Sequence, residues 1–117
     1  MKLIIKADRL IDANSLDPLV NSALVIENGK IVEIISQDKL KVIDTASFDI
    51  IDAGNSTIMP GFIEMHTHMH VNAENDAYKQ VTTESNDFLL MRAVKAVRET
   101  LTSGVTTMRD LGSKNEI

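Results

Sequence analysis

The chain has 117 residues, enough for one modest domain, and its 44% hydrophobic and 25% charged residues are ordinary for a soluble globular protein. Its formal net charge of -5, without a cluster of Lys and Arg, argues against binding to nucleic acid or to an anionic membrane surface. The absence of cysteine excludes disulfide scaffolds, thiol catalysis and cysteine-type zinc sites.

The beginning of the chain predicts neither export nor membrane insertion. Its apolar run is very short, because Asp8 and Arg9 follow too soon for the apolar region of a secretory signal. No segment approaches the roughly 18 uninterrupted apolar residues of a membrane span. We therefore expect a cytoplasmic protein.

Residues 1–59 predict a small antiparallel β subdomain. The dipeptide Asn28-Gly29 separates two β-rich runs and favours a two-residue type I′ turn, because both central positions of that turn need a positive φ. The polar stretch that contains Pro18 predicts a loop over residues 12–18. The expected strands are residues 3–7, 23–27, 30–35, 48–52 and 57–59.

Pro60-Gly61 marks a boundary, and the pattern changes after it. Residues 62–68 are apolar and then rich in histidine, which predicts a buried strand. Residues 72–84 are polar and predict a long loop. Residues 105–108 form a short β-branched run that predicts another strand.

A helix is expected between these strands, over residues 85–103. Ser85 is a suitable N-cap, Asp87 lies in the first turn where the helix dipole favours a negative charge, and Gly104 follows the last turn. Strand, loop, helix and strand make one βαβ unit in residues 60–117, with a parallel strand pair and a covering helix. Four residues at helical spacing define the expected apolar face: Leu90, Val94, Val97 and Leu101.

All three histidines lie close together, as His66, His68 and His70. Residues two apart share one face of a strand, so His66 and His68 can bind one metal ion from the same side. The end of a strand is also where chemistry gathers in α/β barrels. The alternative is that both are strand-end histidines with ordinary hydrogen bonds, which we would favour for a lone histidine. His70 lies nearest the loop, where a solvent-facing side chain is the favoured interpretation.

These residues carry a resemblance to a known family. Residues 59–68, MPGFIEMHTH, resemble the first-strand signature of the amidohydrolase superfamily: Pro-Gly, two apolar residues, an acidic residue, any residue, then His-x-His. The upstream strands resemble the small β-sandwich lead-in of many members. Residues 104–112, GVTTMRDLG, are similar to the second barrel strand of an imidazolonepropionase-like or Xaa-Pro/Xaa-Arg dipeptidase-like subgroup.

The resemblance implies an antiparallel β-sandwich lead-in over residues 1–59, followed by the first βαβ unit of a (β/α)8 TIM-like barrel over residues 60–117. It implies that His66 and His68 are the first ligands of a mono- or binuclear site for a divalent metal. The metal activates a water that attacks a C–N bond of a small-molecule substrate such as an amide, a cyclic amide or a small peptide. Zinc is the expected metal by ligand type, with iron, manganese, cobalt and nickel as alternatives.

Three further residues are candidates for lining the site. Glu64 stands where the family usually has aspartate, and its alternative role is a paired boundary carboxylate. Arg109 and Asp110 end the second strand, where a structural ion pair between them is the favoured alternative. His70 joins these three as a candidate.

The expected barrel is incomplete, because a (β/α)8 barrel takes about 250 residues. The resemblance implies that a lysine or glutamate, two further histidines and an aspartate acting as general base come from later strands. We therefore expect an N-terminal fragment that is inactive in isolation. A non-catalytic interaction module and a metal-binding protein without chemistry stay as alternatives, and the exposed strand edges would also allow a homo-oligomer.

Overall fold

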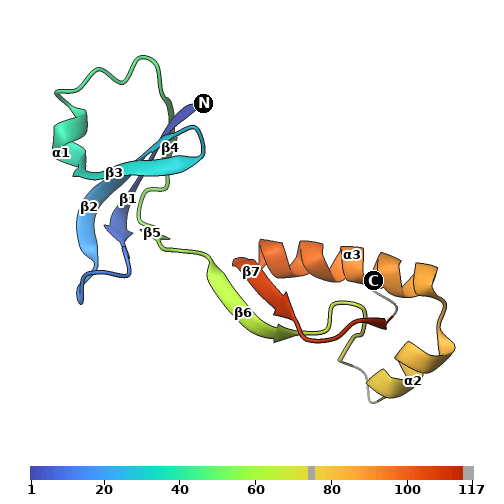
Figure 1. Cartoon of the computed structure of the whole chain (residues 1–117). Helices are drawn as coiled ribbons and strands as arrows, with labels where there is room; N and C mark the ends of the chain where they lie inside the picture. The colour runs from blue at the N-terminus through green and yellow to red at the C-terminus, as the bar shows by residue number, and fades with distance from the viewer. Residues whose placement is uncertain (74–75, 115–117) are drawn as a thin grey trace. The chain divides into compact units, whose positions relative to one another are not determined.

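The computed structural model describes residues 1–73 and 76–114. The chain forms two compact units, Met1–Pro60 and Gly61–Ile117. Figure 1 labels their helices and strands. No helix in the described ranges is both long and apolar enough to cross a membrane.

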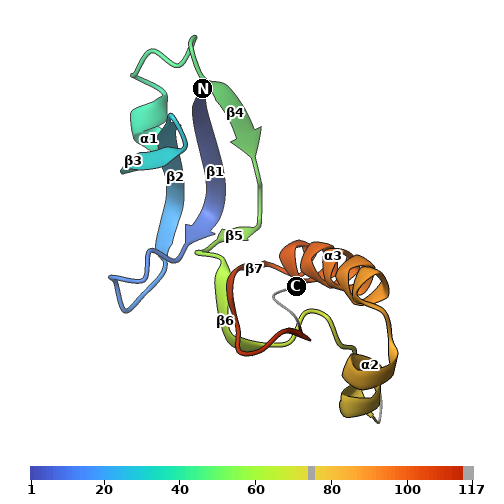
Figure 2. The same ribbon diagram turned by 45° about the vertical axis from the view of Figure 1, so that its right-hand side comes forward.

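The first unit is built on one five-stranded sheet with the order β3-β2-β1-β4, and β5 also pairs with β1 (Figure 2). The pairs β1–β2 and β2–β3 are antiparallel, as expected. The pairs of β1 with β4 and with β5 are parallel, so the prediction of an antiparallel subdomain is wrong for these two strands. The strands are β1 (Lys2–Leu10), β2 (Leu19–Glu27), β3 (Lys30–Ser36), β4 (Asp49–Asp52) and β5 (Thr57–Ile58).

The predicted hairpin between β2 and β3 is confirmed. Asn28 and Gly29 have φ values of 52° and 76°, the left-handed pair that a type I′ turn requires. The expected loop over residues 12–18 is also confirmed, since no strand or helix lies between the end of β1 at Leu10 and the start of β2 at Leu19.

The main hydrophobic cluster of this unit lies on one face of the sheet. Ile4, Ala23, Val25 and Ile35 are buried there, in line with the alternation of side chains along strands. The short helix α1 (Gln37–Leu40) and the segment after it cover this face through Leu40, Ile43 and Phe48. A second sheet layer, which a sandwich requires, stays a prediction.

The second unit contains the expected parallel strand pair, β6 (Phe62–Thr67) and β7 (Val105–Asp110). Two helices lie between these strands in sequence, α2 (Ala77–Thr83) and α3 (Asn86–Thr102). The prediction of a long loop over residues 72–84 is therefore wrong, because α2 occupies most of it. Asp76 starts α2 by accepting a hydrogen bond from the Lys79 backbone N–H at 2.8 Å.

Helix α3 begins and ends where the sequence predicts. The Ser85 hydroxyl accepts a hydrogen bond from the Phe88 backbone N–H, and Gly104 follows the helix with φ at 98°. The buried face, however, differs from the prediction. Leu89 is fully buried, and Ala93 and Ala96 are half-buried beside it. The predicted apolar face is exposed instead: Leu90, Val94, Val97 and Leu101.

Strand β6 also differs from its predicted burial. Phe62, Ile63 and Met65 are each at least half exposed. Within the described residues, β6 pairs only with β7. Parallel strands are normally buried on both faces. The apolar side chains of β6 and the apolar face of α3 are instead exposed to solvent.

Candidate metal centre

The histidine pair lies at the carboxyl end of β6. His66 is the next-to-last residue of the strand, and His68 is the first residue after its end at Thr67. The chain then turns, and the Val71 backbone N–H donates to the His68 carbonyl at 3.2 Å. The two imidazoles therefore stand where the strand gives way to the loop.

The structure brings these two imidazoles together. Their Nε2 atoms are 3.3 Å apart, and their ring centroids are separated by 5.2 Å with 71° between the planes. Two nitrogen ligands bound about 2.05 Å from a tetrahedral zinc ion stand roughly 3.3 Å from each other. The spacing of the two nitrogens is thus that of two ligands of one cation.

A backbone carbonyl orients the second imidazole. His68 Nδ1 lies 3.0 Å from the Gly112 carbonyl oxygen. A carbonyl only accepts, so Nδ1 donates its proton to it. In the neutral ring Nε2 then carries a lone pair, which faces His66 Nε2, and this is the tautomer in which a histidine binds a metal through Nε2.

The side chains of Arg109 and Asp110 hydrogen-bond to backbone groups instead of pairing with each other. The Arg109 Nε–H donates to the Met65 carbonyl at 3.1 Å. The Asp110 carboxylate accepts the backbone N–H groups of Met69 and Gly112, each at 2.9 Å. Between the residues that the structure describes, no ion pair links Arg109 to Asp110, so that alternative is wrong. Consecutive strand residues point to opposite faces, which separates the two side chains.

Burial and hydrogen bonding act in opposite directions on Asp110. Desolvation raises the pKa of its carboxyl, but the backbone N–H groups of Met69 and Gly112 favour the charged form. The electrostatic interactions of Asp110 with His70 and His68 act in the same direction as these hydrogen bonds. The net pKa of Asp110 lies below its ordinary value, so this side chain is an anion at neutral pH.

Glu64 shares its strand face with His66, two residues away. Its Oε1 accepts the His66 backbone N–H at 3.0 Å, so the carboxylate braces the strand just before the histidine pair. Together with His66 and His68 it does not complete a ligand set. No group of three or more His, Cys, Asp or Glu side chains in residues 1–73 and 76–114 is arranged to hold a metal.

His70 is buried, with 4% of its surface exposed, so the prediction of a solvent-facing side chain is wrong. Its ring centroid is 6.4 Å from that of His68. Its Nδ1 atom is buried and has no hydrogen-bond partner among the described residues. The turn after β6 directs the ring inward, where the pattern of strand alternation no longer applies.

A cavity of about 500 Å³ adjoins His68 and His70. Its apolar wall comes from α2, through Ala77, Tyr78 and Val81. The sequence interpretation missed these residues, because the segment was assigned to a loop. Their spacing at i, i+1 and i+4 on a short helix was the signal that could have identified them.

Arg92 ties the loop after β6 to the two helices. Its guanidinium donates to both carboxylate oxygens of Glu84, at 2.6 and 2.8 Å, to Gln80 Oε1 at 3.1 Å and to the His70 carbonyl at 3.2 Å. Gln80 in turn hydrogen-bonds Asn72 through its side-chain amide. The network holds the wall of the cavity against α3.

Glu84 should therefore contribute stability that depends on pH. Its hydrogen bonds to Arg92 outweigh desolvation and lower its pKa from 4.5. A lowered pKa stabilises the fold above the unfolded value, and this stability is lost as the pH falls through the folded value. We expect Glu84→Gln to lower the melting temperature at pH 7, and the gap from the parent to shrink towards pH 3.

Thermal unfolding at the two pH values checks this result, with Glu99→Gln as the matched control. Glu99 pairs with Lys95 on the exposed side of α3 at 3.5 Å, so its replacement should change little at either pH. A gap for Glu84→Gln that is the same at pH 7 and pH 3 would contradict the assignment.

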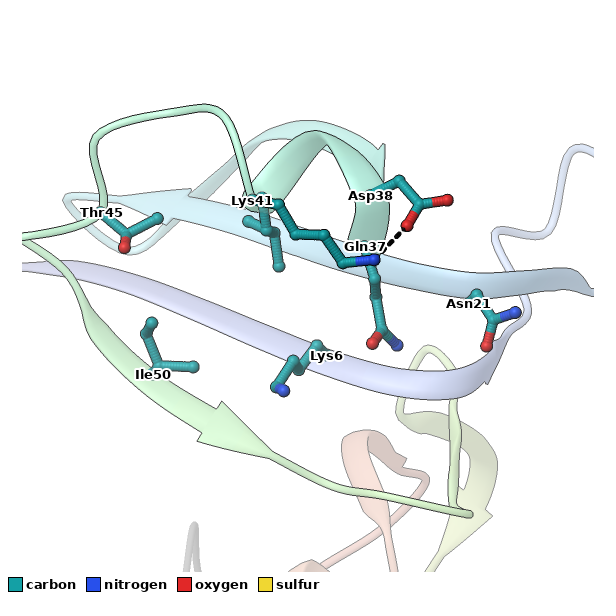
Figure 3. A pocket seen from close by; sticks show the side chains of 8 residues that line it. Lys6, Asn21, Gln37, Asp38, Lys41, Thr45 and Ile50 are labelled. Atoms are coloured by element: carbon teal, nitrogen blue, oxygen red, sulfur yellow. Dashed lines mark hydrogen bonds and ion pairs between the residues drawn. The ribbon is translucent and has the colours of Figure 1, made fainter.

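A second hollow, of about 470 Å³, lies in the first unit (Figure 3). Both of its lysines already have carboxylate partners. Lys41 Nζ is 2.6 Å from Asp38, the pair marked in Figure 3, and Lys6 Nζ is 2.8 Å from Asp52. Both ammonium groups are thus paired within the first unit, and none of the three histidines lines this hollow.

Comparisons with known proteins point to one family. The sequence profile of the amidohydrolase family matches residues 57–116. An imidazolonepropionase of Clostridium tetani is 41% identical over 58 residues, which are 49% of this chain and 14% of that protein. An enamidase of Eubacterium barkeri is 32% identical over 114 residues, 96% of this chain and 26% of the enzyme.

The fold comparison agrees. A prolidase crystallised with N-methylphosphonate-L-proline superimposes with a TM-score of 0.81 and 25% identity, over 96% of this chain and 26% of the prolidase. The chain thus spans about a quarter or less of the length of the proteins that it matches.

Proposed function

Because the chain belongs to the amidohydrolase family, we propose that it is the N-terminal part of a metal-dependent hydrolase acting on C–N bonds. The substrate class is a small molecule with an amide, a cyclic amide or a short peptide bond. The names of its relatives, an imidazolonepropionase and an enamidase, support this class. Residues 1–59 are proposed as a β-sandwich lead-in and residues 60–117 as the start of a (β/α)8 barrel.

The observation that carries the proposal is the 3.3 Å separation of the Nε2 atoms of His66 and His68. These two nitrogens would hold the divalent metal, with zinc as the first candidate, in a mono- or binuclear site. When bound, such a metal lowers the pKa of a water molecule and polarises a carbonyl group. Gly112 orients His68 through its carbonyl, and the cavity beside His68 offers room for the substrate.

His66 and His68 alone do not complete the ligand set of a catalytic zinc site. A catalytic zinc site takes three protein ligands and a water, whereas His66 and His68 supply two. The 117-residue chain alone is therefore proposed to be inactive, with further ligands and the general base supplied by later barrel strands. The exposed apolar side chains of β6 and α3 support this, because further strands and helices would cover them. The cytoplasmic location and the homo-oligomer stay predictions.

Metal removal tests the activity. The whole protein is here the proposed hydrolase with all of its barrel strands. We expect its hydrolysis of amide or cyclic amide substrates to fall to background after treatment with a chelator, because the activated water is lost. Zinc, or another divalent metal, should restore it. Hydrolysis that survives complete metal removal would refute the proposal. Metal binding without hydrolysis of any C–N substrate would favour the non-catalytic alternative.

A further inference from the structure

Two hydrogen bonds join the ends of the two parallel strands, and a third fixes the chain just after β7. The Leu111 backbone N–H donates to the Thr67 carbonyl at 3.1 Å. Asp110 Oδ2 accepts the Met69 N–H and its Oδ1 accepts the Gly112 N–H, each at 2.9 Å. One carboxylate therefore holds the chain after β6 and the chain after β7 at the same time.

The two backbone groups that the Asp110 carboxylate holds, Met69 N–H and Gly112 N–H, belong to residues next to His68 in the chain or in space. Met69 is the next residue along the chain, and Gly112 carries the carbonyl that accepts the His68 Nδ1 proton at 3.0 Å. The Gly112 N–H and carbonyl lie on either side of the Gly112 Cα. If the N–H loses its acceptor, φ and ψ of Gly112 are less constrained, and the carbonyl can leave the imidazole. The proton on His68 is then free to move to Nε2, the atom that faces His66.

We propose that Asp110 is a positioning residue for the histidine pair: by holding the backbone N–H groups of Met69 and Gly112, it keeps the Gly112 carbonyl on His68 Nδ1 and leaves Nε2 unprotonated for a metal. The metal part of this inference rests on the proposed function, whereas the tautomer of His68 does not. Asp110 touches neither the metal nor the substrate in this scheme. It acts through Gly112, whose carbonyl orients the ligand His68.

The tautomer is measured first, on the metal-free whole protein labelled with 15N-histidine. Two-bond 1H–15N correlation spectra distinguish a ring protonated at Nδ1 from one protonated at Nε2. The parent should show His68 protonated at Nδ1. Asp110→Ala should shift it towards the Nε2 form, and Asp110→Asn, which keeps one acceptor oxygen, should shift it less.

Two control variants separate this effect from a change of charge or shape. Asp87→Asn removes the same charge from an exposed position in the first turn of α3 and should leave the His68 tautomer unchanged. Gly112→Ala keeps the carbonyl, and the added methyl would lie 3.8 Å from His68 Cε1, an ordinary contact. It should also retain the Nδ1 form.

Zinc titration of the same variants is the second readout. We expect Asp110→Ala to weaken zinc binding by about 10- to 100-fold and Asp87→Asn to leave it unchanged. An unchanged His68 tautomer in Asp110→Ala overturns the proposal, and if that variant does not fold, Asp110→Asn decides in its place. If Asp110→Ala shifts the His68 tautomer but the parent binds no zinc, the metal site and its proposed function are overturned, while the positioning role holds.

Discussion

Replacing His68 with alanine is expected to weaken zinc binding by about 10²- to 10³-fold. A structural zinc site with four ligands binds with about 10–16 kcal/mol, so one ligand accounts for roughly 2.5–4 kcal/mol. Each tenfold change in affinity corresponds to about 1.4 kcal/mol. His66→Ala should have an effect of the same size, because each of the two Nε2 atoms, 3.3 Å apart, would supply one ligand to the same ion.

The double variant adds a sharper test of the pair. Two groups that bind one ion are coupled, so His66→Ala with His68→Ala should lose less than the sum of the two single losses. His70→Ala is the comparison within the same segment, and it should change zinc affinity far less. Calorimetric titration of the whole protein with zinc measures all four variants. Equal affinity in the parent, His66→Ala and His68→Ala would remove the proposed site.

Gly61→Ala should have the largest effect on stability. A Cβ added at Gly61 would lie 2.7 Å from Thr106 Cβ on the neighbouring strand β7, and closer still to Oγ1 and Cγ2 of that side chain. Threonine cannot withdraw its Cβ by changing rotamer, so the strands themselves must separate. Overpacking of this kind costs about 3 kcal/mol, which should lower the melting temperature by several degrees.

The cause of that loss can be isolated by a second substitution. Thr106→Gly removes all three atoms that the new methyl would meet, whereas Thr106→Ala leaves the Cβ in place. Gly61→Ala should therefore cost much less in a Thr106→Gly background than in the parent, and about as much in a Thr106→Ala background. Gly112→Ala is the matched control and should melt near the parent, since its added Cβ would meet His68 Cε1 at an ordinary distance of 3.8 Å. A parent-like melting temperature for Gly61→Ala would contradict the close approach of the two strands.

Local sequence rules determined the features that depend on a few adjacent residues. Asn28-Gly29 predicted its turn because the positive φ of both residues is a property of the dipeptide itself. Ser85 and Gly104 predicted the ends of α3 because capping involves only the first and last turns. The i, i+2 spacing of His66 and His68 likewise places both side chains on one face of a strand.

Tertiary structure alone decided the features that join distant parts of the chain. The parallel pairing of β4 and β5 with β1 and the burial of Leu89 instead of its apolar neighbours depend on which surfaces meet. The same holds for the partner of His68, since Gly112 lies 44 residues further along the chain. Periodicity describes which side of an element is apolar, but it contains no information about which distant backbone carbonyl or carboxylate comes to lie beside it. The two histidines could therefore be found from the sequence, whereas the groups that orient them required the fold.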